Sequence, residues 1–102
     1  MATLQIFLSE PIHTGQPESA AVMVTGVPQG GEVEITLSQT QGKHPFCGPH
    51  TAKGSADTTG VAFVTFELKF AGPSPTACIK VTARDTIGTY YEPDAHSFQV
   101  LP

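Results

Sequence analysis

Residues 56–66 read ADTTGVAFVTF, an Asp-x-x-Gly turn that opens directly into a run of alternating apolar residues. In such a turn the Asp side chain accepts hydrogen bonds from nearby backbone N–H groups, and Gly takes the position with positive φ. From Ala62 onward every second residue is apolar, which is the period of a strand with one buried face. The other face begins with Val61 and Phe63, so we expect the first half of this strand to be covered on both sides.

The rest of the chain repeats this pattern of short alternating runs between turn residues. Residues 32–38 alternate most strictly, with Val33, Ile35 and Leu37 expected to face the core. Further strands are expected at residues 3–8, 20–25, 60–70, 77–84 and 95–101, with a short edge strand near residue 52. No helical period interrupts them, and strands joined without helices pair antiparallel. The sequence therefore predicts one domain over residues 1–102, an all-β sandwich of about seven antiparallel strands in a Greek key.

Charge and hydropathy exclude several classes of partner. The net charge is −4, and the five cationic residues are scattered along the sequence: Lys43, Lys53, Lys69, Lys80 and Arg84. Nucleic acid binding needs clustered cations, so we expect no nucleic acid partner. No run approaches the roughly 20 apolar residues of a membrane-spanning helix, and the N-terminal residues do not read as a signal peptide. The remaining alternatives are a cytoplasmic protein and a module of a longer, exported chain, of which we favour the second.

The irregular stretch between the third strand and residue 56 contains the sharpest candidate for chemistry. Residues 44–50 read HPFCGPH, which brings three good metal ligands close together in sequence: His44, Cys47 and His50. A fourth ligand would come from His13, His96 or Cys78. The alternative is a pair of exposed histidines beside a packed Phe46. This order of ligands matches none of the common structural zinc patterns, and we expect no cofactor.

The two cysteines allow a disulfide. A bridge between Cys47 and Cys78 would close a loop of about 30 residues and stabilise the fold by roughly 3–4 kcal/mol in the chain-entropy model. Cys78 stands in the outward phase of its strand, opposite Ile79 and Val81, so such a bridge would tie a loop to the surface of a sheet. Two free thiols are the equally weighted alternative.

Signals for catalysis are weak. Cys47 neighbours two histidines in sequence only, and no nucleophile elbow, phosphate-binding loop or dinucleotide motif is present. We therefore expect no enzyme. Asp57 and Asp85 each precede a Gly by three residues, which indicates turn caps, with calcium binding as the alternative. At a strand end, Tyr90 and Tyr91 point to opposite faces, so one is expected to pack and the other to be available to a partner.

These segments together resemble the bacterial immunoglobulin-like domains of the invasin and intimin type. The likeness is carried by the turn and strand of residues 57–66, by IKVTARD at residues 79–85, and by the pair VTGVP and VEITL at residues 24–28 and 33–37. Fibronectin type III and polycystic-kidney-disease-type modules share the same short motifs. A weaker likeness links the chain to neocarzinostatin-type apoproteins, whose two-disulfide pattern is missing here.

The resemblance implies an immunoglobulin-like β-sandwich that is a non-catalytic module. We expect a structural spacer, or an adhesion or binding unit for a protein or carbohydrate partner, in a larger surface or phage-associated protein. The alternative is a small-ligand or metal-binding sandwich that uses the loop of residues 44–50. The expected location is extracellular or at the cell surface, as part of a longer chain.

Overall fold

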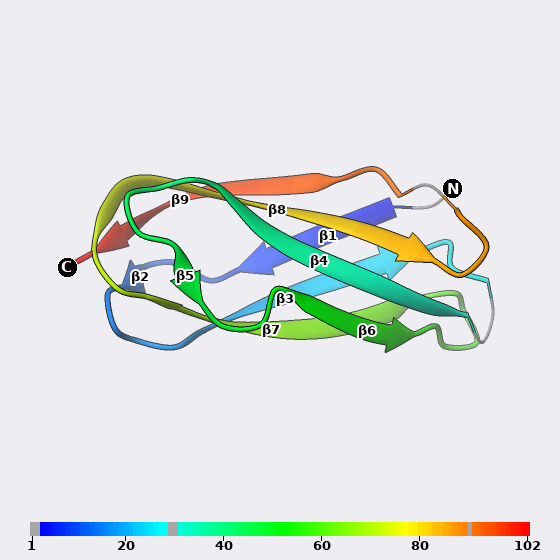
Figure 1. Cartoon of the computed structure of the whole chain (residues 1–102). Helices are drawn as coiled ribbons and strands as arrows, with labels where there is room; N and C mark the ends of the chain where they lie inside the picture. Colours follow the sequence, from blue (N-terminus) through cyan, green and yellow to red (C-terminus); the bar gives the residue numbers. More distant parts are fainter. Residues whose placement is uncertain (1–2, 29–30, 90) are drawn as a thin grey trace.

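The computed structural model describes residues 3–28, 31–89 and 91–102, which form nine strands and no helix. In chain order the strands are β1 (Thr3–Leu8), β2 (Ile12–His13), β3 (Glu18–Thr25), β4 (Glu32–Gln41), β5 (Phe46–Cys47), β6 (Thr51–Ser55), β7 (Ala62–Phe70), β8 (Ser74–Asp85) and β9 (Asp94–Leu101) (Figure 1). None of the described residues belongs to a helix that is long and apolar enough to cross a membrane.

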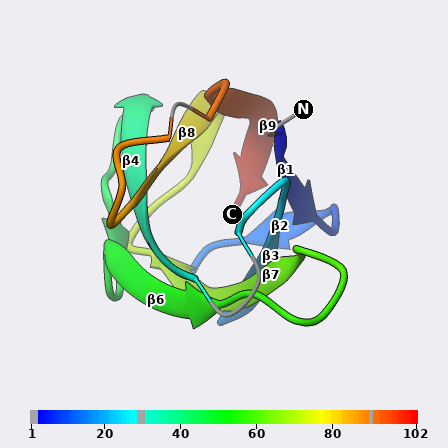
Figure 2. The ribbon, with the colours of Figure 1, turned by 90° about the vertical axis from the view of Figure 1, so that its right-hand side faces the viewer.

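The strands form two sheets that pack face to face, as the end-on view of Figure 2 shows. The first sheet has the order β1-β3-β7-β5 and the second the order β2-β9-β8-β4-β6. The chain passes between the sheets several times, so neighbours in space are distant in sequence. The predicted all-β immunoglobulin-like sandwich is confirmed, and β1 has the predicted bounds.

Two features of the topology differ from the sequence-based expectation of about seven antiparallel strands. The described residues contain two further strands, β2 and β5, each only two residues long and too short for an alternating pattern to mark them. In addition, β2 pairs with β9 in parallel, Ile12 opposite Val100 and His13 opposite Leu101. No crossover helix is needed, because the chain leaves the first sheet after β1, continues in the same direction on the second, and meets the last strand of the sandwich there.

The core lies between the two sheets and follows the alternation of the sequence. In β7 the residues Ala62, Val64, Phe66, Leu68 and Phe70 are buried and the four residues between them are exposed. The inward residues of β4 and β8 cover them from the second sheet, and the buried apolar side chains form one continuous cluster. The inward faces predicted for β4 and β7 are confirmed.

Phe63, on the outward face of β7, is more exposed than its sequence context predicts. Its side chain was expected to be covered on both sides of the sheet, yet 57% of its surface is exposed. No element packs over the outer face of the first sheet at this position, because every described strand already belongs to one of the two layers. Val61, just before β7, is half-buried.

Candidate functional site

The loop that carries the predicted metal ligands is packed against the end of the first sheet. Its strand β5 pairs antiparallel with the last residues of β7. Gln39 fixes its path, because its Nε2 donates to the carbonyl of His44 (2.9 Å) and its Oε1 accepts from the N–H of Phe46 (2.9 Å). Phe46 is buried, with its ring 6.4 Å from that of Phe70, and Cys47 is exposed. The loop therefore covers an edge of the sandwich.

The structure does not bring together His44, Cys47 and His50, the predicted metal ligands. Among the described residues no three His, Cys, Asp or Glu side chains gather closely enough to hold a metal ion. The ring of His50 lies instead on Phe46, with centroids 4.5 Å apart, and its Nδ1 is 3.2 Å from the carbonyl oxygen of Leu37. Bends at residues 43–44, 48 and 50 flank the two-residue strand β5, and along this path the three side chains do not converge.

The structure holds Cys47 and Cys78 as free thiols rather than as a bridge. Cys47 lies on β5 at the edge of the first sheet, whereas Cys78 lies on β8 in the second sheet. The outward position expected of Cys78 is found, because Ala77 and Ile79 on either side of it are fully buried. The two thiols therefore belong to different layers of the sandwich.

Tyr91, one of the two adjacent tyrosines considered for partner binding, is a core residue. Only 2% of its surface is exposed, and its hydroxyl donates a hydrogen bond of 2.9 Å to Oδ2 of Asp85. Burial, followed by the hydrogen bond and the negative charge of Asp85, raises the pKa of Tyr91 to about 12. Tyr90 lies outside the described residues. Tyr91 is therefore the tyrosine of the pair that packs, and its ring closes the end of the core beside the turn that follows β8.

Asp57 and Asp85 cap two turns of the same construction. Oδ1 of Asp57 accepts from the N–H groups of residues 59 and 61, and Oδ1 of Asp85 accepts from those of residues 87 and 89. Gly60 and Gly88 take positive φ angles of 81° and 80°. The predicted turn-capping role is confirmed. Hydrogen bonds lower the pKa of both carboxyl groups. The largest contribution comes from the side chain of Thr59 for Asp57 and from that of Thr89 for Asp85. The pKa of Asp85 falls to about 2.

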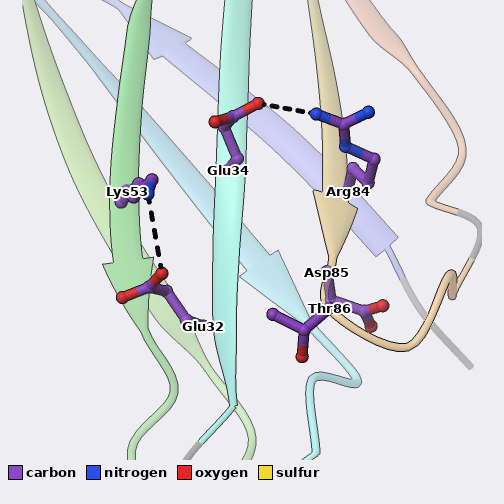
Figure 3. A pocket seen from close by; sticks show the side chains of 6 residues that line it. All are labelled: Glu32, Glu34, Lys53, Arg84, Asp85 and Thr86. Carbon is purple, nitrogen blue, oxygen red and sulfur yellow. Dashed lines mark hydrogen bonds and ion pairs between the residues drawn. The ribbon is translucent and has the colours of Figure 1, made fainter.

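A shallow hollow on the outer face of the second sheet gathers charged side chains (Figure 3). Its volume is about 240 Å³, and its lining consists of Glu32, Glu34, Lys53, Arg84, Asp85 and Thr86, from β4, β6 and the end of β8. The strand register places Lys53 and Arg84 on either side of Glu34. Nη2 of Arg84 donates to Oε1 of Glu34 at 3.0 Å, while Nζ of Lys53 lies 4.0 Å from Oε1 of Glu32.

A second hollow of about 350 Å³ shares Glu34 and Arg84 and adds Thr36 and Thr82. Thr36 lies opposite Thr82 on one side and Thr51 on the other, which makes a row of hydroxyls across three strands. Carboxylates, cations and hydroxyls at the surface can form ion pairs and hydrogen bonds with a polar partner. We call the outer surface of β6, β4 and β8 the polar face.

The polar face also gathers cationic side chains among its carboxylates. Three of the five cationic residues of the chain, Lys53, Lys80 and Arg84, lie on β6 and β8 in the outward phase of the second sheet, whereas the molecule carries −4 overall. This cluster could not be predicted from the sequence, because its residues come from β6 and β8, which are far apart along the chain. The alternation of each strand predicts that these side chains point outward. Only the pairing of β6 and β8 with β4 shows that they lie on the same face.

The ion pairs of the polar face are expected to contribute little to folding. Arg84 is largely exposed, and exposed pairs contribute about 0–1 kcal/mol. We expect Arg84→Ala and Glu34→Ala to change the free energy of unfolding by at most about 0.5 kcal/mol, measured by urea denaturation. The control is Ile35→Ala, a fully buried neighbour on β4, which is expected to cost about 2–5 kcal/mol. A loss of about 2 kcal/mol or more for the charged pair would make it a structural element.

Comparison with known proteins supports the fold and goes no further. No protein-family model matches the chain, and no curated protein matches its sequence. A cohesin module from a Clostridium perfringens ATCC13124 family 33 glycoside hydrolase has a similar structure, with a TM-score of 0.63 and 9% identity over 98% of this chain and 96% of that one. A FixG-related protein from Vibrio parahaemolyticus has a TM-score of 0.58 and 13% identity over 97% and 95% of the two chains.

Proposed function

We propose that this protein is a non-catalytic immunoglobulin-like module that acts as a spacer and binding unit of a larger protein at a cell surface or on a phage particle. The observation that carries the proposal is the path of the chain through an elongated sandwich of 43 × 19 × 18 Å. β1 begins at one end of the long axis and β9 ends at the other (Figure 1). A module of this kind adds its full length to a chain in which it is inserted.

The terminal strands are joined in a way that suits a spacer under tension. β2 and β9 run in parallel toward the same end, and the N–H of Thr14 adds a 2.8 Å hydrogen bond to the carbonyl of Leu101. The N–H of Ile6 in β1 donates to Oδ2 of Asp94 at the start of β9 (3.0 Å). Pulling the two ends of the domain apart therefore slides β1 and β2 along β9 and loads these hydrogen bonds together.

Forced unfolding of single molecules tests this role. Handles at residues 3 and 101 load the strands in shear, whereas handles at residues 71 and 101, at the same end of the sandwich, peel β9 from β8 one pair at a time. We expect a clearly higher unfolding force for the first geometry, because unfolding under load depends on the barrier met along the pulling direction. Equal unfolding forces in the two geometries would contradict the role of a spacer that carries tension.

The binding part of the proposal places a protein or carbohydrate partner on the polar face. Its support is the row of hydroxyls and the interspersed carboxylates and cations over β6, β4 and β8. The likeness to invasin- and intimin-type domains supports a setting at the cell surface, and the Clostridium neighbour is itself described as a module from a larger enzyme. Binding of a carbohydrate is tested by NMR, in which amide shifts of isotope-labelled protein are followed as soluble neutral oligosaccharides are added. Amide shifts confined to residues outside the polar face would contradict this placement.

A further inference from the structure

The outer face of the first sheet carries an apolar patch that the spacer role does not use. Phe63 on β7 and Phe7 on β1 are 57% and 45% exposed, and Met23 and Ala21 of β3 lie between these strands. The register sets Met23 between Gln5 and Phe63 in one row, and Ala21 between Phe7 and Thr65 in the next. We call the patch of Phe7, Ala21, Met23 and Phe63 the apolar face.

Exposure of this size on one face indicates an interaction surface. Of three large apolar side chains that are strongly exposed among the described residues, two belong to the apolar face, and the third, Ile87, stands in the turn after β8. Scattered single apolar residues are normal on protein surfaces, whereas contiguous patches mark contact sites. The register makes the apolar face contiguous.

The shape of the apolar face fits a flat partner. It is the outer surface of three paired strands, and the four hollows identified among the described residues are lined by other side chains. A small ligand or a projecting side chain would find no pocket there. A polysaccharide would need hydrogen-bonding groups between the two aromatic rings, and the intervening strand presents Met23 and Ala21 instead.

The apolar face is a surface at which a second copy of this chain can pack without the repulsion that its net charge otherwise causes. The molecule carries −4, so most contacts between two copies bring like charges together. The outward residues around the apolar face are uncharged: Thr3, Gln5, Thr25 and Thr65, with Glu67 the first charge along β7. Two such faces meet without repulsion, and a two-fold axis lying between them buries the same side chains of both copies.

We propose that the apolar face is a self-association surface on which a second copy packs sheet to sheet. Stacked sheets lie about 10 Å apart with their strands at about −30°. The whole outer sheet, three strands at about 4.8 Å spacing and seven or eight residues long, gives at most roughly 350 Å² per copy, against about 800 Å² in a stable interface. The dimer is therefore weak and reversible. It sets molecules side by side and leaves both ends of each sandwich free.

Sedimentation equilibrium of the full chain tests the proposal from about 10 μM to about 1 mM, a range chosen for dissociation constants in the high micromolar region. The wild type is expected to form a dimer that Phe63→Glu weakens at least tenfold. Ile87→Glu is the matched control, because it introduces the same charge at an exposed apolar residue away from the apolar face, and it is expected to leave the dimer within twofold. A monomer at every concentration, or equal weakening by both variants, overturns the proposal.

Concentration-dependent amide shifts of the wild type give a readout that does not depend on how the variants fold. The dimer predicts that the shifting amides cluster on β1, β3 and β7, around residues 5–7, 21–23 and 63–65. Shifts that cluster on the second sheet would place the contact elsewhere and overturn the assignment.

Discussion

Replacing Phe70 with Ala is expected to destabilise the fold by about 3–5 kcal/mol, the range for a large buried aromatic residue. Phe70 is fully buried at the end of β7, and its ring meets those of Phe46 (6.4 Å) and Phe98 (5.6 Å) edge to face. These contacts join β7 to β5 within the first sheet and to β9 in the second. The substitution therefore leaves a cavity where three strands meet, in addition to the lost burial.

Urea denaturation measures this effect, and Phe63→Ala is the matched control on the same strand. Phe63 points outward and loses little burial, so its substitution is expected to cost less than about 1 kcal/mol. The free energy of unfolding of a domain is about 5–15 kcal/mol, so Phe70→Ala removes a large part of it. Comparable losses for the two variants would contradict the assignment of the inward and outward faces of β7.

Replacing Tyr91 with Phe is expected to cost about 1.5–3 kcal/mol, the range for a hydrogen bond to a charged group. The hydroxyl of Tyr91 is buried and donates to Oδ2 of Asp85, whose other oxygen caps the turn of residues 85–88. The pair also makes stability depend on pH at both ends of the scale. Urea midpoints measured from acid to alkaline pH detect both effects.

The loss of folding stability at acid pH, the acid limb of the stability profile, comes from Asp85. Its pKa is lowered to about 2 in the folded state from an ordinary value of 3.8, so the carboxylate stabilises the fold above about pH 4 and this contribution disappears as the pH falls toward 2. Asp85→Asn is expected to flatten this limb more than Asp57→Asn, because Asp57 caps an exposed turn without a buried partner. An equal effect of the two variants would contradict the role of the Tyr91 pair.

The alkaline limb comes from Tyr91. Its pKa rises to about 12 in the folded state from an ordinary value of 10, so its contribution is present in full below pH 10 and is lost as the pH rises through 12. Tyr91→Phe is expected to flatten this limb. An unchanged slope in the variant would place the hydroxyl outside the core.

The fold could be predicted from the sequence because alternation reports burial directly. Val33, Ile35 and Leu37 face the core as their spacing indicates, and Asp57 and Asp85 form the turns that their spacing to Gly predicts. The two-residue strands β2 and β5 are too short to carry a period. Their existence depends on partners elsewhere in the chain, which local pattern does not contain.

The surfaces proposed for binding could not be predicted in the same way. Lys53, Lys80 and Arg84 look scattered until β6 and β8 lie on either side of β4 in one sheet. The sequence suggests that Phe63 is buried, because it does not show whether another layer covers the outer face of β7. His44, Cys47 and His50 look like a ligand set because they are near one another in sequence, but the path of the loop does not bring the three side chains together.

Solution scattering from a tandem of two copies tests the central claim that the chain enters and leaves at opposite ends. Both copies carry Phe63→Glu, so that self-association through the apolar face does not influence the result, and a short linker joins the end of β9 to the start of the next β1. We predict a maximum dimension of roughly double the 43 Å long axis of one copy. A maximum dimension close to that of one copy, with the two sandwiches folded back side by side, would contradict the spacer.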